Sequence, residues 1–124
     1  MPLDRIQLEG MVFYGYHGVG PEEQSLGQRF VVDIEVEKDL RTAGATDEIS
    51  DTVNYSELYR TVKEIVEGPS RKLLENVAET ISRQVLLKFD VEAVRVKVKK
   101  PEVPMKGSIL KHASVEIFRE RDGL

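Results

Sequence analysis

Cysteine is absent from the 124-residue sequence, which excludes disulfides, thiolate nucleophiles and thiolate zinc sites. Long apolar runs are absent too: nowhere do about 18 apolar residues follow one another, and no apolar run follows the first five residues. A cytoplasmic protein with no membrane partner is therefore expected. Basic residues are not in excess, because 18 Lys and Arg stand against 22 Asp and Glu, for a net charge of −4. This balance lacks the electrostatic signature of a nucleic-acid-binding face, so no nucleic-acid partner is expected.

The length predicts a single domain over residues 1–124, since domains commonly span roughly 100–200 residues. Hydrophobic residues make up 40% of the chain and charged residues 32%, a balance typical of a globular protein. A chain of this size buries only about two-thirds of its unfolded surface, which favours association with further subunits. The sequence has no GxSxG, P-loop or GxGxxG motif, which disfavours serine hydrolases, P-loop NTPases and dinucleotide enzymes.

The first half of the chain predicts two antiparallel strands. Residues 6–14 have β-rich character that is interrupted by Gly10, which indicates a bulge or bend. Within residues 30–37, apolar side chains at every second position alternate with Val31 and three acids, as expected of a strand with one buried and one wet face. Residues 19–27, between the two strands, carry turn residues at both ends and predict a loop. This loop is long for a hairpin connection, which hints at function.

The period then changes to that of helices and returns to that of strands. Asn54, with Glu57 three residues later, resembles a capping box and predicts a helix that ends before Gly68-Pro69. A second amphipathic helix is expected to begin near Leu73. Alternation over residues 94–99 and 113–117 predicts two more strands, separated by a loop at 101–111.

The resulting ββααββ order predicts an α+β fold, with a four-stranded antiparallel sheet and two helices on one face. Two helices cannot cover both faces of such a sheet, and its two edges stay unpaired within one chain. Edge-to-edge assembly of several subunits into a barrel would solve both difficulties.

Lys100 is the most informative single position. The parity that sends Lys97 and Lys99 outward places Lys100 on the same side as Val96 and Val98. An ammonium group moved toward a low-dielectric face loses hydration, which favours its neutral form and suits it to proton transfer. The alternative is that the strand ends at Lys99 and that Lys100 turns into solvent ahead of Pro101.

Other candidate residues each have a plain structural explanation. Glu75 lies in the first turn of the second helix, where the exposed amides favour a carboxylate, although it could also anchor a ligand with two N–H donors. Tyr55 begins the first helix, where most tyrosines are packing residues. The adjacent acids Glu22 and Glu23 lie in the long loop. The histidines, at positions 17 and 112, have no third partner at zinc-binding spacing, so no metal site is expected.

Four segments in this order resemble the dihydroneopterin aldolase family of folate biosynthesis. They are GMVFYGYHG at 10–18, GQRF at 27–30, DTVNY at 51–55, and LLENVA at 73–78 with KKP at 99–101 downstream. The resemblance covers nearly the whole chain. It implies the tunnelling fold, in which ββααββ subunits join edge to edge into a barrel, and a homo-octamer of two stacked rings, or a homotetramer.

The resemblance also implies a reaction and its substrate. The reaction is retro-aldol cleavage of 7,8-dihydroneopterin, a small pterin, to 6-hydroxymethyl-7,8-dihydropterin and glycolaldehyde, which in many family members is accompanied by epimerisation at the side-chain 2′ carbon. No cofactor, metal or Schiff base is implied, because the C=N bond of the dihydropterin accepts the electrons released on carbon–carbon cleavage. The enzyme then has only to move protons and hold geometry.

The same resemblance implies roles for individual residues. Lys100 would be the general acid/base, and Tyr55, contributed across a subunit interface, would help to protonate the enol-like intermediate. Glu75, supported by the backbone of Leu74, would hold the N–H edge of the pterin. Glu23 would face the polyol tail, with Glu22 as the alternative after a one-residue slip. Two departures from the family pattern are Asn54, where relatives often carry another polar residue, and the less proline-rich stretch at 104–107.

Two other functions remain open on the sequence. One is a dihydroneopterin triphosphate epimerase on the same scaffold, which would need an added basic pocket for phosphate near the polyol tail. The other is a non-catalytic pterin-binding oligomer, which would keep its affinity for the ligand if the amine of Lys100 were removed.

Overall fold

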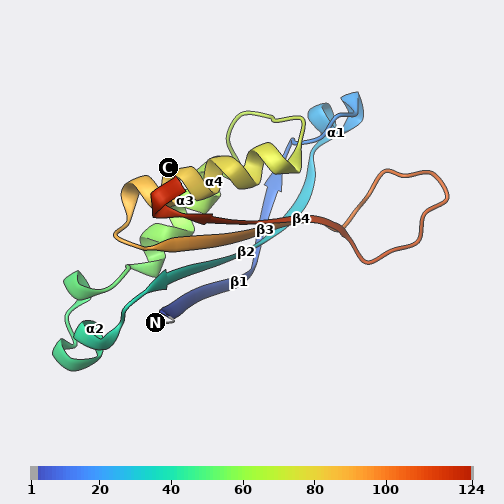
Figure 1. Cartoon of the computed structure of the whole chain (residues 1–124). Helices are drawn as coiled ribbons and strands as arrows, with labels where there is room; N and C mark the ends of the chain where they lie inside the picture. The colour runs from blue at the N-terminus through green and yellow to red at the C-terminus, as the bar shows by residue number, and fades with distance from the viewer. Residues whose placement is uncertain (1–2, 124) are drawn as a thin grey trace.

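The computed structural model describes residues 3–123 and, within them, one antiparallel sheet of four strands (Figure 1). The strands are β1 (Asp4–Gly15), β2 (Gln28–Lys38), β3 (Ala93–Lys100) and β4 (Ala113–Glu120), and they lie side by side in that order. β1 and β4 are the two edges. The predicted α+β architecture with a four-stranded antiparallel sheet is confirmed.

Two long helices, α3 (Tyr55–Val66) and α4 (Leu74–Lys88), cover one face of the sheet (Figure 1). Asn54 caps α3 as predicted, because its side-chain oxygen accepts a hydrogen bond from the N–H of Ser56 at 3.0 Å. None of the helices within residues 3–123 has the length and apolar character needed to cross a membrane.

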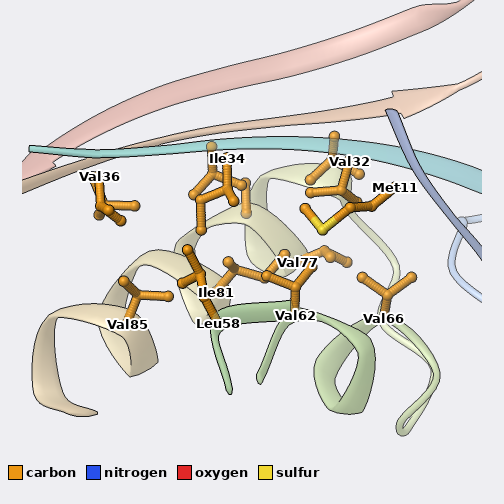
Figure 2. Close-up of a cluster of buried hydrophobic side chains, with 14 of the residues drawn as sticks. Met11, Val32, Ile34, Val36, Leu58, Val62, Val66, Val77, Ile81 and Val85 are labelled. Carbon is orange, nitrogen blue, oxygen red and sulfur yellow. The ribbon is translucent and has the colours of Figure 1, made fainter. Parts of the chain in front are cut away.

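The core lies between this helix pair and the inner face of the sheet (Figure 2). The alternation of β2 puts Val32, Ile34 and Val36 on that face, where they are buried as predicted. Each fully buried side chain of this size contributes about 1.5–3 kcal/mol relative to an exposed one. The helices supply the other half of the core, from Leu58, Val62, Val66, Val77, Ile81 and Val85.

The predicted interruption at Gly10 is a β-bulge. The register of β1 against β2 shifts between the pairs Leu8–Ile34 and Met11–Val32. Gly10 has φ +70°, a left-handed conformation that favours glycine. Its N–H donates to the carboxylate of Asp33 at 2.7 Å, so the bulge leaves no unpaired donor at this position.

The segment at 19–27 is not only a loop, and this part of the prediction was wrong. It contains a short helix, α1 (Pro21–Leu26), which begins with proline and two acids and ends at Gly27, where φ is +72°. None of its residues is buried, so the sequence has no apolar periodicity here that would indicate a helix. Two other short elements, α2 (Arg41–Thr46) and the 3₁₀ turn η1 (Ile49–Asp51), fill the connection from β2 to α3, and a further 3₁₀ turn, η2 (Arg121–Gly123), follows β4.

Candidate active site

Lys100 and Glu23 form an ion pair at the end of β3. Lys100 Nζ lies 2.6 Å from Glu23 Oε2, and the two side chains are only 13% and 11% exposed. Glu23 Oε2 also accepts a hydrogen bond from the side-chain amide of Gln28 at 2.9 Å, and Oε1 accepts one from the N–H of Gly20 at 3.1 Å. The carboxylate is therefore held from three directions, by α1's own N-terminus, by β2 and by β3.

The strand parity explains why Lys100 points inward. Val98 is buried in the core, and Lys99 lies on the opposite face, where its Nζ pairs with Asp33 at 2.8 Å. Lys100 then returns to the inner face while still paired in the sheet with Ala113. The alternative in which the strand ends at Lys99 is wrong.

The surroundings of Glu23 lower the pKa of its carboxyl group. Burial alone would raise this pKa, but the hydrogen bonds from Lys100, Gly20 and Gln28 outweigh burial and stabilise the carboxylate. Glu23 is thus an anion at neutral pH, directly beside the amine.

Gly18 lets the chain wrap closely around this carboxylate. Its φ is +146°, and a Cβ at this position would lie 2.4–2.5 Å from the carboxyl atoms of Glu23. A side chain here would collide with the ion pair, so the turn after β1 requires glycine.

His17 connects this turn to the loop between α3 and α4. The ring is fully buried, with Nε2 2.6 Å from the carbonyl oxygen of Val66 and Nδ1 accepting from the N–H of Arg71 at 3.0 Å. Burial lowers the pKa of His17, and the charges of Arg71 and Lys100 lower it further, against the bond to Val66, which raises it. A ring whose Nδ1 accepts and whose Nε2 donates is neutral, which agrees with this lowered pKa.

Leu74 and Glu75 follow that loop in the first turn of α4. Leu74 is half-buried and Glu75 is exposed. Arg71, three residues before Leu74, accepts a hydrogen bond at its carbonyl oxygen from the N–H of Gly18 at 2.9 Å. The predicted ligand anchor therefore begins a few residues from the turn that surrounds Glu23, at the same end of the sheet as Lys100.

Tyr55 does not lie at the end of the sheet where Lys100 lies. It is 62% exposed and lines an open cleft of about 700 Å³ together with residues 5–7 of β1 and residues of the α2 connection. Ile6 pairs with Val36, which pairs with Val94. Since Lys100 is six residues further along β3, a rise of about 3.3 Å per residue separates the two levels by about 20 Å.

The remaining predicted residues have simpler positions. Of the two adjacent acids, Glu23 is the one that contacts Lys100, whereas Glu22 is exposed on the outside of α1. Within the part of the chain that the structure describes, no three His, Cys, Asp or Glu side chains are grouped so as to hold a metal ion.

Gln28 was not among the residues expected at the site, and His17 was considered only as a metal ligand. Gln28 shares the inner face of β2 with Phe30, so the parity argument that found Lys100 would also have found it. The partners of His17 lie 49 and 54 residues away, and no local pattern announces such bonds.

An enclosed lysine–carboxylate pair on an antiparallel α+β scaffold has the two kinds of group that general acid–base catalysis uses, which makes this end of the sheet the candidate active site. The comparison with known families is specific. The family model described as dihydroneopterin aldolase matches residues 6–118, and the chain belongs to this family.

Individual relatives agree with this membership. The chain is 50% identical over 120 residues to dihydroneopterin aldolase of Bacillus subtilis, covering 96% of this chain and 99% of that protein. It is 46% identical over 120 residues to dihydroneopterin aldolase 1 of Arabidopsis thaliana, covering 96% and 82%. The crystal structure of E. coli dihydroneopterin aldolase in complex with neopterin superimposes with a TM-score of 0.87 at 32% identity, covering 94% of this chain and 99% of that one.

Proposed function

We propose that this chain is a dihydroneopterin aldolase whose proton transfers are carried out by Lys100 together with Glu23. The observation that carries the proposal is the 2.6 Å contact between Lys100 Nζ and Glu23 Oε2 in an almost enclosed position. Family membership supplies the substrate, 7,8-dihydroneopterin, and the pathway, folate biosynthesis.

The reaction requires a group that removes a proton from the substrate and a group that returns one, and such a pair can do both. The proton of the side-chain 2′-hydroxyl passes to the Lys100–Glu23 pair, directly or through water, and the bond between the 1′ and 2′ carbons breaks. Its electrons move into the C=N bond of the dihydropterin ring, and glycolaldehyde leaves. A proton returned to the 1′ carbon then gives 6-hydroxymethyl-7,8-dihydropterin. Reprotonation of the 2′ oxygen after bond re-formation on the other face of the aldehyde gives the epimer.

The pterin ring would be held by the first turn of α4. The carboxylate of Glu75 is exposed and can accept two parallel N–H bonds from the guanidine-like edge of the ring. The backbone of Leu74 supports the same edge. Both residues follow the loop that is hydrogen-bonded to Gly18, so the ring would lie beside Glu23 and Lys100.

Tyr55 would come from a second copy of the chain, because the two levels of the sheet are about 20 Å apart within one copy. The cleft of Tyr55 borders the edge strand β1, and Lys100 lies one strand from the other edge, β4. Pairing β1 of one copy with β4 of the next therefore brings Tyr55 of one copy and Lys100 of the other to the same subunit interface. Closing a barrel also staggers the paired strands along their length, which reduces the difference in level between the two residues. We infer a ring of subunits, a homotetramer or a stacked homo-octamer, with active sites at the interfaces.

The direct test is to incubate the purified protein with 7,8-dihydroneopterin and measure glycolaldehyde. We expect release of glycolaldehyde together with the 2′ epimer, and absence of both products at high enzyme concentration would refute the proposal. Faster turnover of dihydroneopterin triphosphate would favour the epimerase instead. Pterin binding without turnover would favour a binding oligomer.

A further inference from the structure

We propose that His17 is a positioning residue that fixes the distance between the two halves of the pterin site. One half is the Glu23–Lys100 pair, and the other is the Leu74–Glu75 turn of α4. The inference rests on the proposed function, because it assigns the spacing to a ligand that touches both halves.

The ring of His17 connects two backbone groups that would otherwise lack partners. Val66 is the last residue of α3, and its carbonyl belongs to the final turn, where no intrahelical donor is available. The Nε2–H of His17 supplies that donor at 2.6 Å, and Nδ1 accepts the N–H of Arg71 at 3.0 Å. One side chain therefore fixes both ends of the connection between α3 and α4.

The position of the ring is itself tightly defined. It packs against Phe30, with ring centroids 5.3 Å apart at an interplanar angle of 66°. The backbone of Gly15 passes so close that a Cβ there would lie 2.7 Å from the carbonyl oxygen of Val66 and 3.1 Å from the ring of His17. Little room remains for the ring to shift, so its two hydrogen bonds hold the connection at one distance from β1.

Both halves of the site are a short stretch of chain away from this ring. On one side, Gly18 follows His17 and lies against the carboxylate of Glu23. On the other side, Arg71 precedes Leu74 by three residues, and its carbonyl oxygen accepts the N–H of Gly18 at 2.9 Å. A displacement of Arg71 relative to His17 would therefore move Glu75 relative to Lys100.

The competing explanation is a core histidine that only fills space. A leucine fills similar space but leaves the N–H of Arg71 and the carbonyl of Val66 unpaired. An asparagine offers its side-chain oxygen near the position of Nδ1 and so keeps the acceptor for Arg71, whereas a glutamine offers its amide nearer to Nε2 and keeps the donor for Val66. These three substitutions separate filling from positioning.

The test measures neopterin affinity, together with KM and kcat for 7,8-dihydroneopterin, in His17→Leu, His17→Asn and His17→Gln. We expect His17→Leu to weaken neopterin binding and raise KM by about tenfold or more, with a smaller effect on kcat, since a buried polar group loses its partner. We expect His17→Asn to restore affinity to within about threefold of the wild type and His17→Gln to restore less. Val85→Ala is the matched control, because it weakens the core at the far end of α4 without touching the site.

The outcomes separate the inference from the proposed function. Wild-type protein that neither binds neopterin nor cleaves dihydroneopterin would refute the function itself. Active wild type with unchanged KM in His17→Leu would overturn the positioning role, as would an equal loss of affinity in Val85→Ala. If His17→Leu does not fold, the other two variants decide: tighter binding by His17→Asn than by His17→Gln supports the role, and equal binding overturns it.

Discussion

Lys100 Nζ and Glu23 Oε2 lie 2.6 Å apart although the residues are 77 positions apart in the sequence. The contact joins the end of β3 to the short helix α1 and closes the inner face of the sheet at that end. Both side chains are nearly enclosed, so water screens their charges less than it would at the surface. A ligand that binds beside the pair therefore interacts strongly with these charges.

Replacing Lys100 by alanine removes the amine from the proposed proton path. We expect kcat for dihydroneopterin cleavage to fall by about 10²-fold or more, while neopterin affinity changes less. Lys99→Ala is the matched control, because Lys99 is the next residue but lies on the opposite face with Asp33. Its activity should stay within about twofold, since removing a partly exposed ion pair costs only about 0–1 kcal/mol of stability. Equal losses in both variants would contradict the role of Lys100.

The two adjacent acids of α1 provide a similarly direct comparison. Glu23→Gln keeps the shape of the side chain but removes the charge that faces Lys100, so we expect kcat to fall by about tenfold or more. Glu22→Gln alters an exposed neighbour and should leave kcat unchanged. Steady-state kinetics on both variants decide the assignment. A larger loss in Glu22→Gln would indicate that the loop acid is the other one.

Much of this site follows from sequence patterns, and the reason is periodicity. Val94, Val96 and Val98 mark the inner face of β3, so parity places Lys100 on that face provided that the strand continues to it, as it does in the structure. In the same way, the alternation of β2 predicts the core face. These patterns work because burial repeats every second residue along a strand.

The parts that could not be predicted depend on contacts without a local period. α1 buries none of its residues, so its only helix signals were a proline, two acids and a terminal glycine, and proline and glycine are equally typical of the loop that was predicted. His17 is hydrogen-bonded to backbone groups of residues 49 and 54 positions away. Because every residue type has a backbone carbonyl, and nearly every type a backbone N–H, the identity of these partners gives no sequence signal. The separation of Tyr55 from Lys100 depends on strand register, which pairing in three dimensions determines.

The lowered pKa of His17 predicts how stability depends on pH. In the unfolded chain this histidine titrates near its ordinary value of 6.5, whereas in the folded chain it stays neutral to lower pH. Between these two pKa values the unfolded state binds more protons, so the unfolding free energy falls as the pH drops through this window. Denaturant titrations from pH 7.5 downward should show this slope and should show less of it in His17→Asn. An identical slope in the variant would assign the dependence to other groups.

The backbone conformations of Gly10 and Gly44 predict opposite effects on stability when each glycine is replaced by alanine. A Cβ at Gly10 meets nothing within 4 Å, but φ is +70°, so Gly10→Ala should cost about 1–2 kcal/mol from backbone strain alone. Gly44 also has open space and lies inside α2, so Gly44→Ala should stabilise the fold by about 0.5–1 kcal/mol. Unfolding free energies from denaturant titration test both. Destabilisation by Gly44→Ala would contradict the helical assignment of its surroundings.

The separation of Tyr55 from Lys100 within one chain predicts that two defective variants can complement each other. Lys100→Ala and Tyr55→Phe should each be nearly inactive when assembled alone. If each site takes its lysine from one copy and its tyrosine from the next, random mixing of equal amounts leaves about a quarter of the sites with both residues intact. We therefore expect activity to return to about a quarter of the wild-type level after the mixed subunits are dissociated and reassembled, and not when preassembled oligomers are simply combined. A mixture that stays inactive after verified subunit exchange would mean that each chain builds its site alone, and that Tyr55 reaches Lys100 by some route other than a neighbouring subunit.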